Sequence, residues 1–148
     1  MAARPVRLTA LSPTAAATQL SSEAGEKWAR QFLQAFESQL RLVPLERLMA
    51  TWELSASATA RVFGVSRQAV AKWRITSVPA DRLVVLADLS AATDVLERHV
   101  RRDRIPAVVR RPAPFLGGVS LLQMAETGQS VEVRRRVTEM FDLRRVAP

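Results

Sequence analysis

The chain has 148 residues, 48% of them hydrophobic and 24% charged, so it can form one domain or two small ones around a modest apolar core. It contains no cysteine, which excludes disulfides, cysteine-ligated zinc and cysteine nucleophiles. Its 22 basic residues outnumber 14 acidic ones and give a formal net charge of +8. Nucleic-acid binding explains this excess most simply, although the arginine bias of a GC-rich genome would also produce it.

Good helix formers dominate long stretches of the chain and glycine is scarce, which predicts an all-α protein. The first 22 residues are rich in Ala, Thr, Ser and Pro without helical periodicity, and we expect a flexible tail there. No apolar run approaches the length of a membrane span, and no continuous apolar segment follows the N-terminal arginines as in a signal peptide. We therefore expect a soluble, cytoplasmic protein without a membrane partner.

An amphipathic helix is predicted over residues 23–42, because four large apolar side chains recur every four residues. They are Trp28, Phe32, Phe36 and Leu40. Aromatic side chains in such a stripe form a core or a dimer interface more often than a ligand site. Pro44 suits the first turn of a further helix, so we expect the first helix to end before it.

Two short helices separated by a three-residue turn are predicted at residues 55–75, the spacing of a helix-turn-helix module. Ser55 and Ser66 are suitable N-caps for the two helices, and Gly64 can adopt the left-handed conformation that ends the first. The module also needs a small residue where the helices cross and a β-branched anchor in the second helix. These are Ala60 and Val70.

The composition of this module suits DNA, because residues 55–74 contain four basic side chains and no acidic one. Arg67 and Gln68 would lie near the start of the second helix, where they can make bidentate contacts with guanine and adenine in the major groove. Lys72, Arg74 and Thr76 are better placed for phosphates. The predicted DNA-binding residues are Ser66, Arg67, Gln68, Ala71, Lys72, Arg74 and Thr76. The alternative is a scaffold that has kept the module and no longer binds DNA.

The rest of the chain, from Pro79 onwards, also has the pattern of helices. A long helix is predicted from Pro79 to Arg101 or Arg102, and a short one over residues 106–110. A Pro-rich loop follows over residues 111–118. Ser120 is a suitable N-cap for a helix through Ala125, and Ser130 for a last helix over residues 131–143. We therefore expect a tail at 1–22, a helix-turn-helix domain at 23–102 and a small helical partner-binding domain at 103–148.

No enzymatic site is evident in the sequence, so we expect a protein that is not an enzyme and has no catalytic residue, metal or cofactor. His99 is the single histidine and lies among arginines, which rules out a triad of serine, histidine and acid. Gly117 and Gly118 lack the flanking strand and the following lysine of a phosphate-binding loop.

Residues 54–87 resemble the Xre-type helix-turn-helix regulators, and residues 105–133 look like the toxin-binding domain of the Xre/MbcA/ParS antitoxins. That domain has a Pro-rich turn, a Leu-Gly-Gly segment, a small helix starting with Ser or Thr, and a Gly before the last helix. The corresponding residues are Pro112, Pro114, Leu116, Gly117, Gly118, Ser120 and Gly128. The resemblance covers about residues 45–143. Many members carry a tryptophan ahead of the turn, where this chain has Val108 or Val109.

The resemblance implies an antitoxin of a type II toxin–antitoxin module. The partner would be a cognate toxin, in this family often a RES-type enzyme that consumes NAD, and the complex would repress its own promoter. The expected toxin-binding residues are Phe115, Leu116, Met140, Phe141, Arg144 and Arg145. Two alternatives stay open: a stand-alone Xre-like transcription regulator whose C-terminal part dimerises or binds another partner, and a protein-interaction adaptor.

A homodimer is expected, because one module reads too few bases for useful specificity and two half-sites multiply it. The candidate interfaces are the helix that contains Trp28 and the long helix from Pro79. The sequence does not choose between them.

Overall fold

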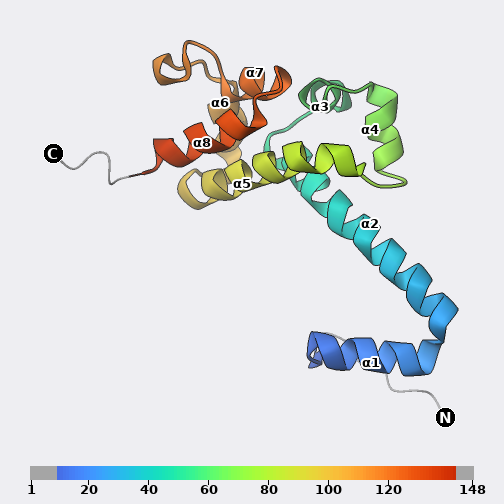
Figure 1. Ribbon diagram of the computed structural model, residues 1–148. Coiled ribbons are helices and arrows are strands. Elements are labelled where there is room, and N and C mark those ends of the chain that lie inside the picture. Colours follow the sequence, from blue (N-terminus) through green and yellow to red (C-terminus); the bar gives the residue numbers. More distant parts are fainter. Residues whose placement is uncertain (1–9, 143–148) are drawn as a thin grey trace. The chain divides into compact units, whose positions relative to one another are not determined.

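The computed structural model describes residues 10–142, and these residues form eight α-helices joined by short 3-10 turns, with no strand among them (Figure 1). The predicted all-α class is therefore confirmed. The chain divides into two compact units between Glu37 and Ser38.

The first unit contains helix α1 (Pro13–Ala24) and the first half of α2 (Glu26–Thr51). The flexible tail expected through residue 22 is thus a helix from Pro13 onwards, while residues 1–9 lie outside the described part. The Ser12 hydroxyl accepts a hydrogen bond from the Ala15 backbone N–H at 3.3 Å, and Pro13 occupies the first turn. Alanine propensity together with this start signal explains a helix that has no apolar periodicity. Gly25, with φ +77°, separates the two helices.

Helix α2 runs through Pro44 without ending, which corrects the expectation that a new helix begins there. Proline lacks the N–H that would bond the Leu40 carbonyl, at a cost of about 3 kcal/mol in a helix interior. The turns that follow Pro44 offset this cost, because Leu45 and Leu48 are fully buried in the core of the second unit.

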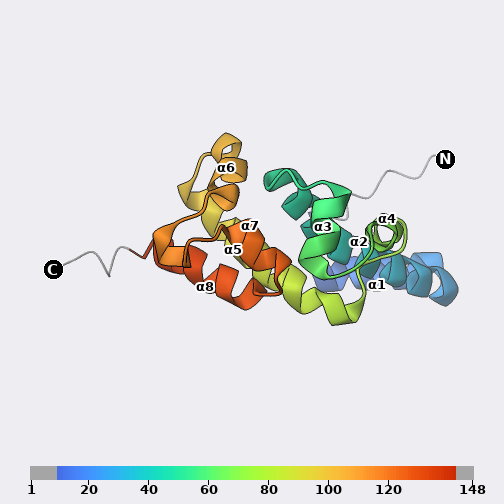
Figure 2. The same ribbon diagram turned by 90° about the horizontal axis from the view of Figure 1, so that it is seen from above.

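The second unit, from Ser38 onwards, has one apolar core that extends from Leu45 to Val137. Its further helices are α3 (Ala56–Phe63), α4 (Arg67–Trp73), α5 (Leu83–His99), α6 (Ile105–Arg110), α7 (Leu121–Glu126) and α8 (Ser130–Met140). Helix α8 lies alongside α5, and α7 packs on α3 (Figures 1 and 2). Residues 23–102 and 103–148, expected as two domains, therefore do not have separate cores, and the division falls at residue 37 instead.

Trp52 anchors the end of α2 in this core, with no exposed surface. Its indole Nε1 donates to Thr93 Oγ1 at 3.0 Å, and that hydroxyl donates to the Leu89 carbonyl at 2.7 Å. The Arg110 guanidinium donates to the carbonyls of Trp52 and Glu53, both at 2.8 Å. These carbonyls follow the end of α2, where they have no partner within the helix. The contacts tie α2 to α5 and α6 at the point where α3 begins.

Asp88 is an acidic side chain on the buried face of α5, with 4% of its surface exposed. Ser130 Oγ donates to its Oδ2 at 3.1 Å, and Arg134 Nη1 lies 3.2 Å from its Oδ1. Ser130 was expected to be the N-cap of α8, but Gln129 occupies that position and the serine hydroxyl serves Asp88 instead. A buried carboxylate needs such partners, so Asp88 fixes where α8 lies on α5.

A second polar link joins α2 to α5 at the surface. The Arg47 guanidinium lies 2.6 Å from Asp94 and also bonds Glu97, which accepts a further hydrogen bond from the Thr51 hydroxyl at 3.2 Å. The hydrogen bond from Arg47 is the main reason why the pKa of Glu97 is lowered, and the pKa of Arg47 is raised in turn. Both changes favour the charged pair.

Acidification should therefore weaken the second unit through Glu97. A carboxyl group whose pKa is lowered by folding stabilises the fold above its unfolded-state pKa, and this contribution is lost as the pH falls through the folded-state value. Glu97→Gln should lower the urea midpoint at about pH 7 and flatten its decline towards about pH 3. Glu53→Gln, at an exposed side chain, is the matched control. Parallel pH profiles for the wild type and Glu97→Gln would contradict this prediction.

Candidate nucleic-acid and partner interfaces

Helices α3 and α4 begin and end where the local sequence predicts. The Ser55 hydroxyl accepts from the Ala58 N–H at 3.1 Å and caps α3, which ends at Gly64 in the left-handed conformation, with φ +64°. The Val65 N–H then donates to the Ala60 carbonyl at 2.9 Å, so the turn satisfies the carbonyls at the end of the helix. The two helices predicted over residues 55–75 are confirmed as helices, while their role as a helix-turn-helix stays a prediction.

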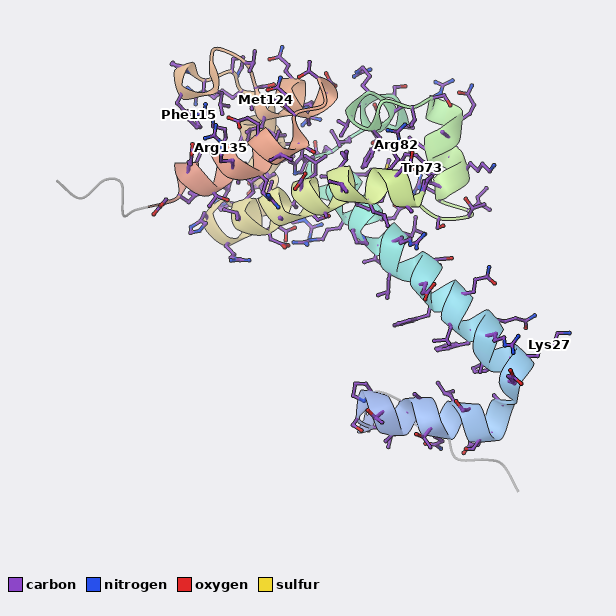
Figure 3. The ribbon with its side chains drawn as sticks, viewed as in Figure 1. Lys27, Trp73, Arg82, Phe115, Met124 and Arg135 are labelled. Atoms are coloured by element: carbon purple, nitrogen blue, oxygen red, sulfur yellow. The ribbon has the colours of Figure 1, made fainter. Side chains whose placement is uncertain are left out.

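The inner face of α4 holds it against the core. Val70 has no exposed surface, and Trp73 is 5% exposed. The Trp73 ring packs edge-on against Phe63 of α3, with ring centroids 5.5 Å apart and an interplanar angle of 90° (Figure 3). These contacts fix the rotation of α4 about its axis and therefore decide which side chains face outwards.

The outer face of α4 carries the predicted DNA-binding residues. All seven are exposed: Ser66, Arg67, Gln68, Ala71, Lys72, Arg74 and Thr76. Within residues 10–142, neither the Arg67 guanidinium nor the Lys72 ammonium has an ion-pair partner. Helix α4 also lies at the end of the second unit opposite to α6 and α8 (Figures 1 and 2). The cationic face is therefore open to a large ligand.

Three of the seven side chains already have partners within the chain. Arg74 bonds the Glu46 carboxylate with two nitrogens, at 2.6 and 3.1 Å. Residues 55–74 contain no acidic side chain, but the surface that they form does include one, because α2 brings Glu46 to the end of α4. The Ser66 hydroxyl caps α4, and the Thr76 hydroxyl donates to the Lys72 carbonyl at 2.9 Å. Arg67, Gln68 and Lys72 are left as the strongest candidates for DNA contacts.

Ile75 was missed in the sequence, although it is 88% exposed directly after α4. The sequence pattern could have indicated its exposure, since Ile75 falls outside the helical spacing of the buried residues Val70 and Trp73. It adds an apolar side chain beside the cationic face.

The Leu-Gly-Gly segment closes a compact turn. Gly117 and Gly118 both have positive φ, +78° and +82°, which suits glycine. The Gly118 N–H donates to the Ala113 carbonyl at 3.0 Å. The turn points the two preceding side chains in opposite directions: Phe115 is 44% exposed, whereas Leu116 is 7% exposed. Leu116 was expected to contact a partner protein and is instead a core residue.

A groove of about 500 Å³ lies beside this turn and the end of α8. Its lining residues are Phe115, Arg136, Glu139, Met140 and Phe141. Met140 is 37% exposed, and Phe141 stacks on His99 with ring centroids 4.6 Å apart. The structure therefore brings together three of the expected partner-binding residues. Arg144 and Arg145 lie outside the described residues.

Two arginines of α8, Arg135 and Arg136, are paired with acidic residues along the helix. Glu132 accepts hydrogen bonds from Arg135 at 2.9 and 2.6 Å and from Arg136 at 2.8 Å. The hydrogen bond from Arg135 is the main reason why the pKa of Glu132 is lowered and that of Arg135 is raised. The rim of the groove is thus electrically balanced, which suits a protein partner better than a phosphate backbone.

Two absences concern the described part of the chain. Within residues 10–142, no three side chains of histidine, aspartate or glutamate are placed to hold a metal ion. None of the described helices combines the length and the apolar character that crossing a membrane requires.

The chain matches no protein-family model, and no curated protein or solved structure matches it either. The two surfaces and the resemblance of residues 45–143 are therefore the only guides to its function.

The turn can be tested by substitution at Gly117. Alanine there should lower the free energy of unfolding by about 1 kcal/mol, because the left-handed conformation strains a side chain. Apart from Gly117 itself and its two chain neighbours, no atom lies within 4 Å of the place where a Cβ would stand, so the effect comes from the backbone alone. Gly117→Asn is the matched control and should lose less, since asparagine tolerates this conformation better. If the urea unfolding curve of the alanine variant coincides with that of the wild type, the prediction is contradicted.

Proposed function

We propose that the chain is a DNA-binding repressor of the antitoxin type. The α3–α4 pair acts as a helix-turn-helix, and the C-terminal groove binds a cognate toxin. One observation carries the proposal: among the described residues, 10–142, Arg67 and Lys72 have no ion-pair partner, and they lie on the outer face of a helix whose inner face is fixed in the core by Val70 and Trp73.

In this proposal α4 lies in the major groove of the operator. Arg67 makes two hydrogen bonds to a guanine, and Gln68 makes two to an adenine. Lys72 neutralises a phosphate, which adds affinity without sequence preference. A dimer presents two such helices to two half-sites.

The groove beside the Leu-Gly-Gly turn supports a protein partner. Phe115, Met140 and Phe141 are aromatic or methionine side chains, which are enriched at the centres of protein interfaces. The resemblance to the Xre/MbcA/ParS antitoxins suggests what the partner is: a toxin, of the RES type or a related NAD-consuming kind. The chain itself needs no catalytic group or cofactor for this role.

The second candidate is a stand-alone regulator, and one contact favours it. Helix α7 packs on α3, with Arg61 Nε 3.1 Å from Glu126 Oε1. The C-terminal helices thus support the DNA-binding pair directly, which would explain them without a toxin.

DNA binding can be measured by fluorescence anisotropy with the chain's own promoter and a scrambled duplex. Arg67→Ala with Gln68→Ala should remove the preference for the promoter and leave helicity unchanged. Lys72→Ala should weaken binding to both duplexes and reduce the slope of log affinity against log salt by about 1.

Arg101→Ala is the matched control for this experiment, because it removes one positive charge from the same unit at a site away from α4. It should keep the promoter preference. Promoter preference retained by the Arg67 and Gln68 double variant would disprove the assignment of α4 as the recognition helix.

Toxin binding can be measured by co-purification with the product of an adjacent toxin-like gene and by growth of the co-expressing cells. Phe115→Glu with Met140→Glu should release the toxin and stop growth, while promoter binding persists. Val131→Glu is the control, since Val131 is 56% exposed on α8 but outside the groove. If the groove variant still co-purifies with the toxin, or if the wild type binds none, the stand-alone regulator is the better explanation.

A further inference from the structure

The first unit exposes large apolar side chains. None of its described residues, 10–37, is buried. Trp28, Leu33 and Phe36 are 43, 57 and 51% exposed. The ring of Phe32 stacks on Trp28 and on Phe36, with centroids 5.2 and 5.9 Å apart. An apolar cleft of about 440 Å³ opens between α1 and α2 beside these rings.

The contacts within this unit give its helices little stability. Helix α1 has 12 residues, a length that is marginal in water, and α2 is held in a core only through its own second half. Folding has to offset about 1 to 2 kcal/mol of backbone entropy per residue. Here no side chain of the described unit is fully removed from water to supply that energy. A contiguous exposed apolar surface of this kind usually marks an interaction site. A partner must therefore cover the face.

The charges of the unit favour a partner other than nucleic acid. Its described residues carry three acidic and two basic side chains: Glu23, Glu26, Glu37, Lys27 and Arg30. The cationic face of α4, in contrast, belongs to the second unit. A helical surface whose charges nearly balance can pair with a copy of itself without strong repulsion.

The spacing along α2 is complementary to itself in one orientation. Leu33 and Phe36 are three residues apart, like positions a and d of a heptad, and Arg30 and Glu37 are then both at position e. In an antiparallel pair, e positions of the two helices face each other beside the a–d contacts. Leu33 of one chain then packs on Phe36 of the other. Arg30, which also pairs with Glu26 of its own helix, faces Glu37 of the other chain. A parallel pair would place Glu37 beside Phe32, without this charge match.

We propose that residues 13–37 form the homodimer interface, in which two copies of α2 pair antiparallel through Leu33 and Phe36. The two-fold axis makes each contact twice, including the pair between Arg30 and Glu37. The use of the dimer to read two half-sites rests on the proposed DNA-binding function. The existence of the dimer does not depend on that function.

The test is sedimentation equilibrium of the full chain without DNA, over a range of concentrations. The wild type should be a dimer, and Leu33→Asp with Phe36→Asp should raise the dimer Kd by about 100-fold or more, because central apolar contacts dominate such interfaces. Val84→Asp is the control, since Val84 is 67% exposed on α5, the other candidate interface. It should leave the dimer intact. Circular dichroism and urea unfolding check that the second unit stays folded.

A charge reversal tests the orientation. Arg30→Glu should raise the dimer Kd by about tenfold, because both symmetric pairs become repulsive. Adding Glu37→Arg should restore wild-type affinity. Four results would each overturn the proposal. The wild type is a monomer; the dimer survives Leu33→Asp with Phe36→Asp; Val84→Asp breaks the dimer; or Glu37→Arg fails to rescue Arg30→Glu. Promoter binding is measured separately, so failure of the dimer and failure of DNA binding are distinguishable.

Discussion

The second unit depends on the way Trp52 is held at the end of α2. Its indole is fully buried and hydrogen-bonded to Thr93 of α5, while Arg110 of α6 binds the Trp52 carbonyl. The same arginine binds the carbonyl of Glu53, whose φ of +50° turns the chain towards α3. The chain leaves this junction in a fixed direction, and α3 and α4 follow from it. Removing the ring would leave a large cavity and would also remove the hydrogen bond that the Thr93 hydroxyl accepts.

The sequence predicts those parts of the fold that local chemistry decides. Ser55, Gly64 and Ser66 act within a few residues of themselves, as caps or as a left-handed turn, so the bounds of α3 and α4 could be predicted closely. The same holds for Ser120, whose hydroxyl and the Gln123 side chain form a capping box at the start of α7. These interactions are short in sequence and need no knowledge of tertiary packing.

Contacts between distant residues could not be predicted in this way. Glu46 neutralises Arg74 across 28 residues, and Asp88 binds Ser130 across 42, and neither pairing leaves a local pattern. Leu116 is buried and its neighbour Phe115 is exposed because they lie on opposite sides of the turn. The backbone of Gly117 and Gly118 determines which side each one takes. The candidate site therefore shrinks from seven side chains on α4 to Arg67, Gln68 and Lys72. Tertiary packing, rather than propensity, made these selections.

The central claim is that the outer face of α4 reads base sequence. Selection of binding sites by the full chain from a pool of random DNA duplexes tests it most directly. The account predicts enrichment of inverted half-sites about 10 base pairs apart between centres, each with guanine and adenine in adjacent positions. A pool that shows no enriched sequence after repeated rounds would contradict it.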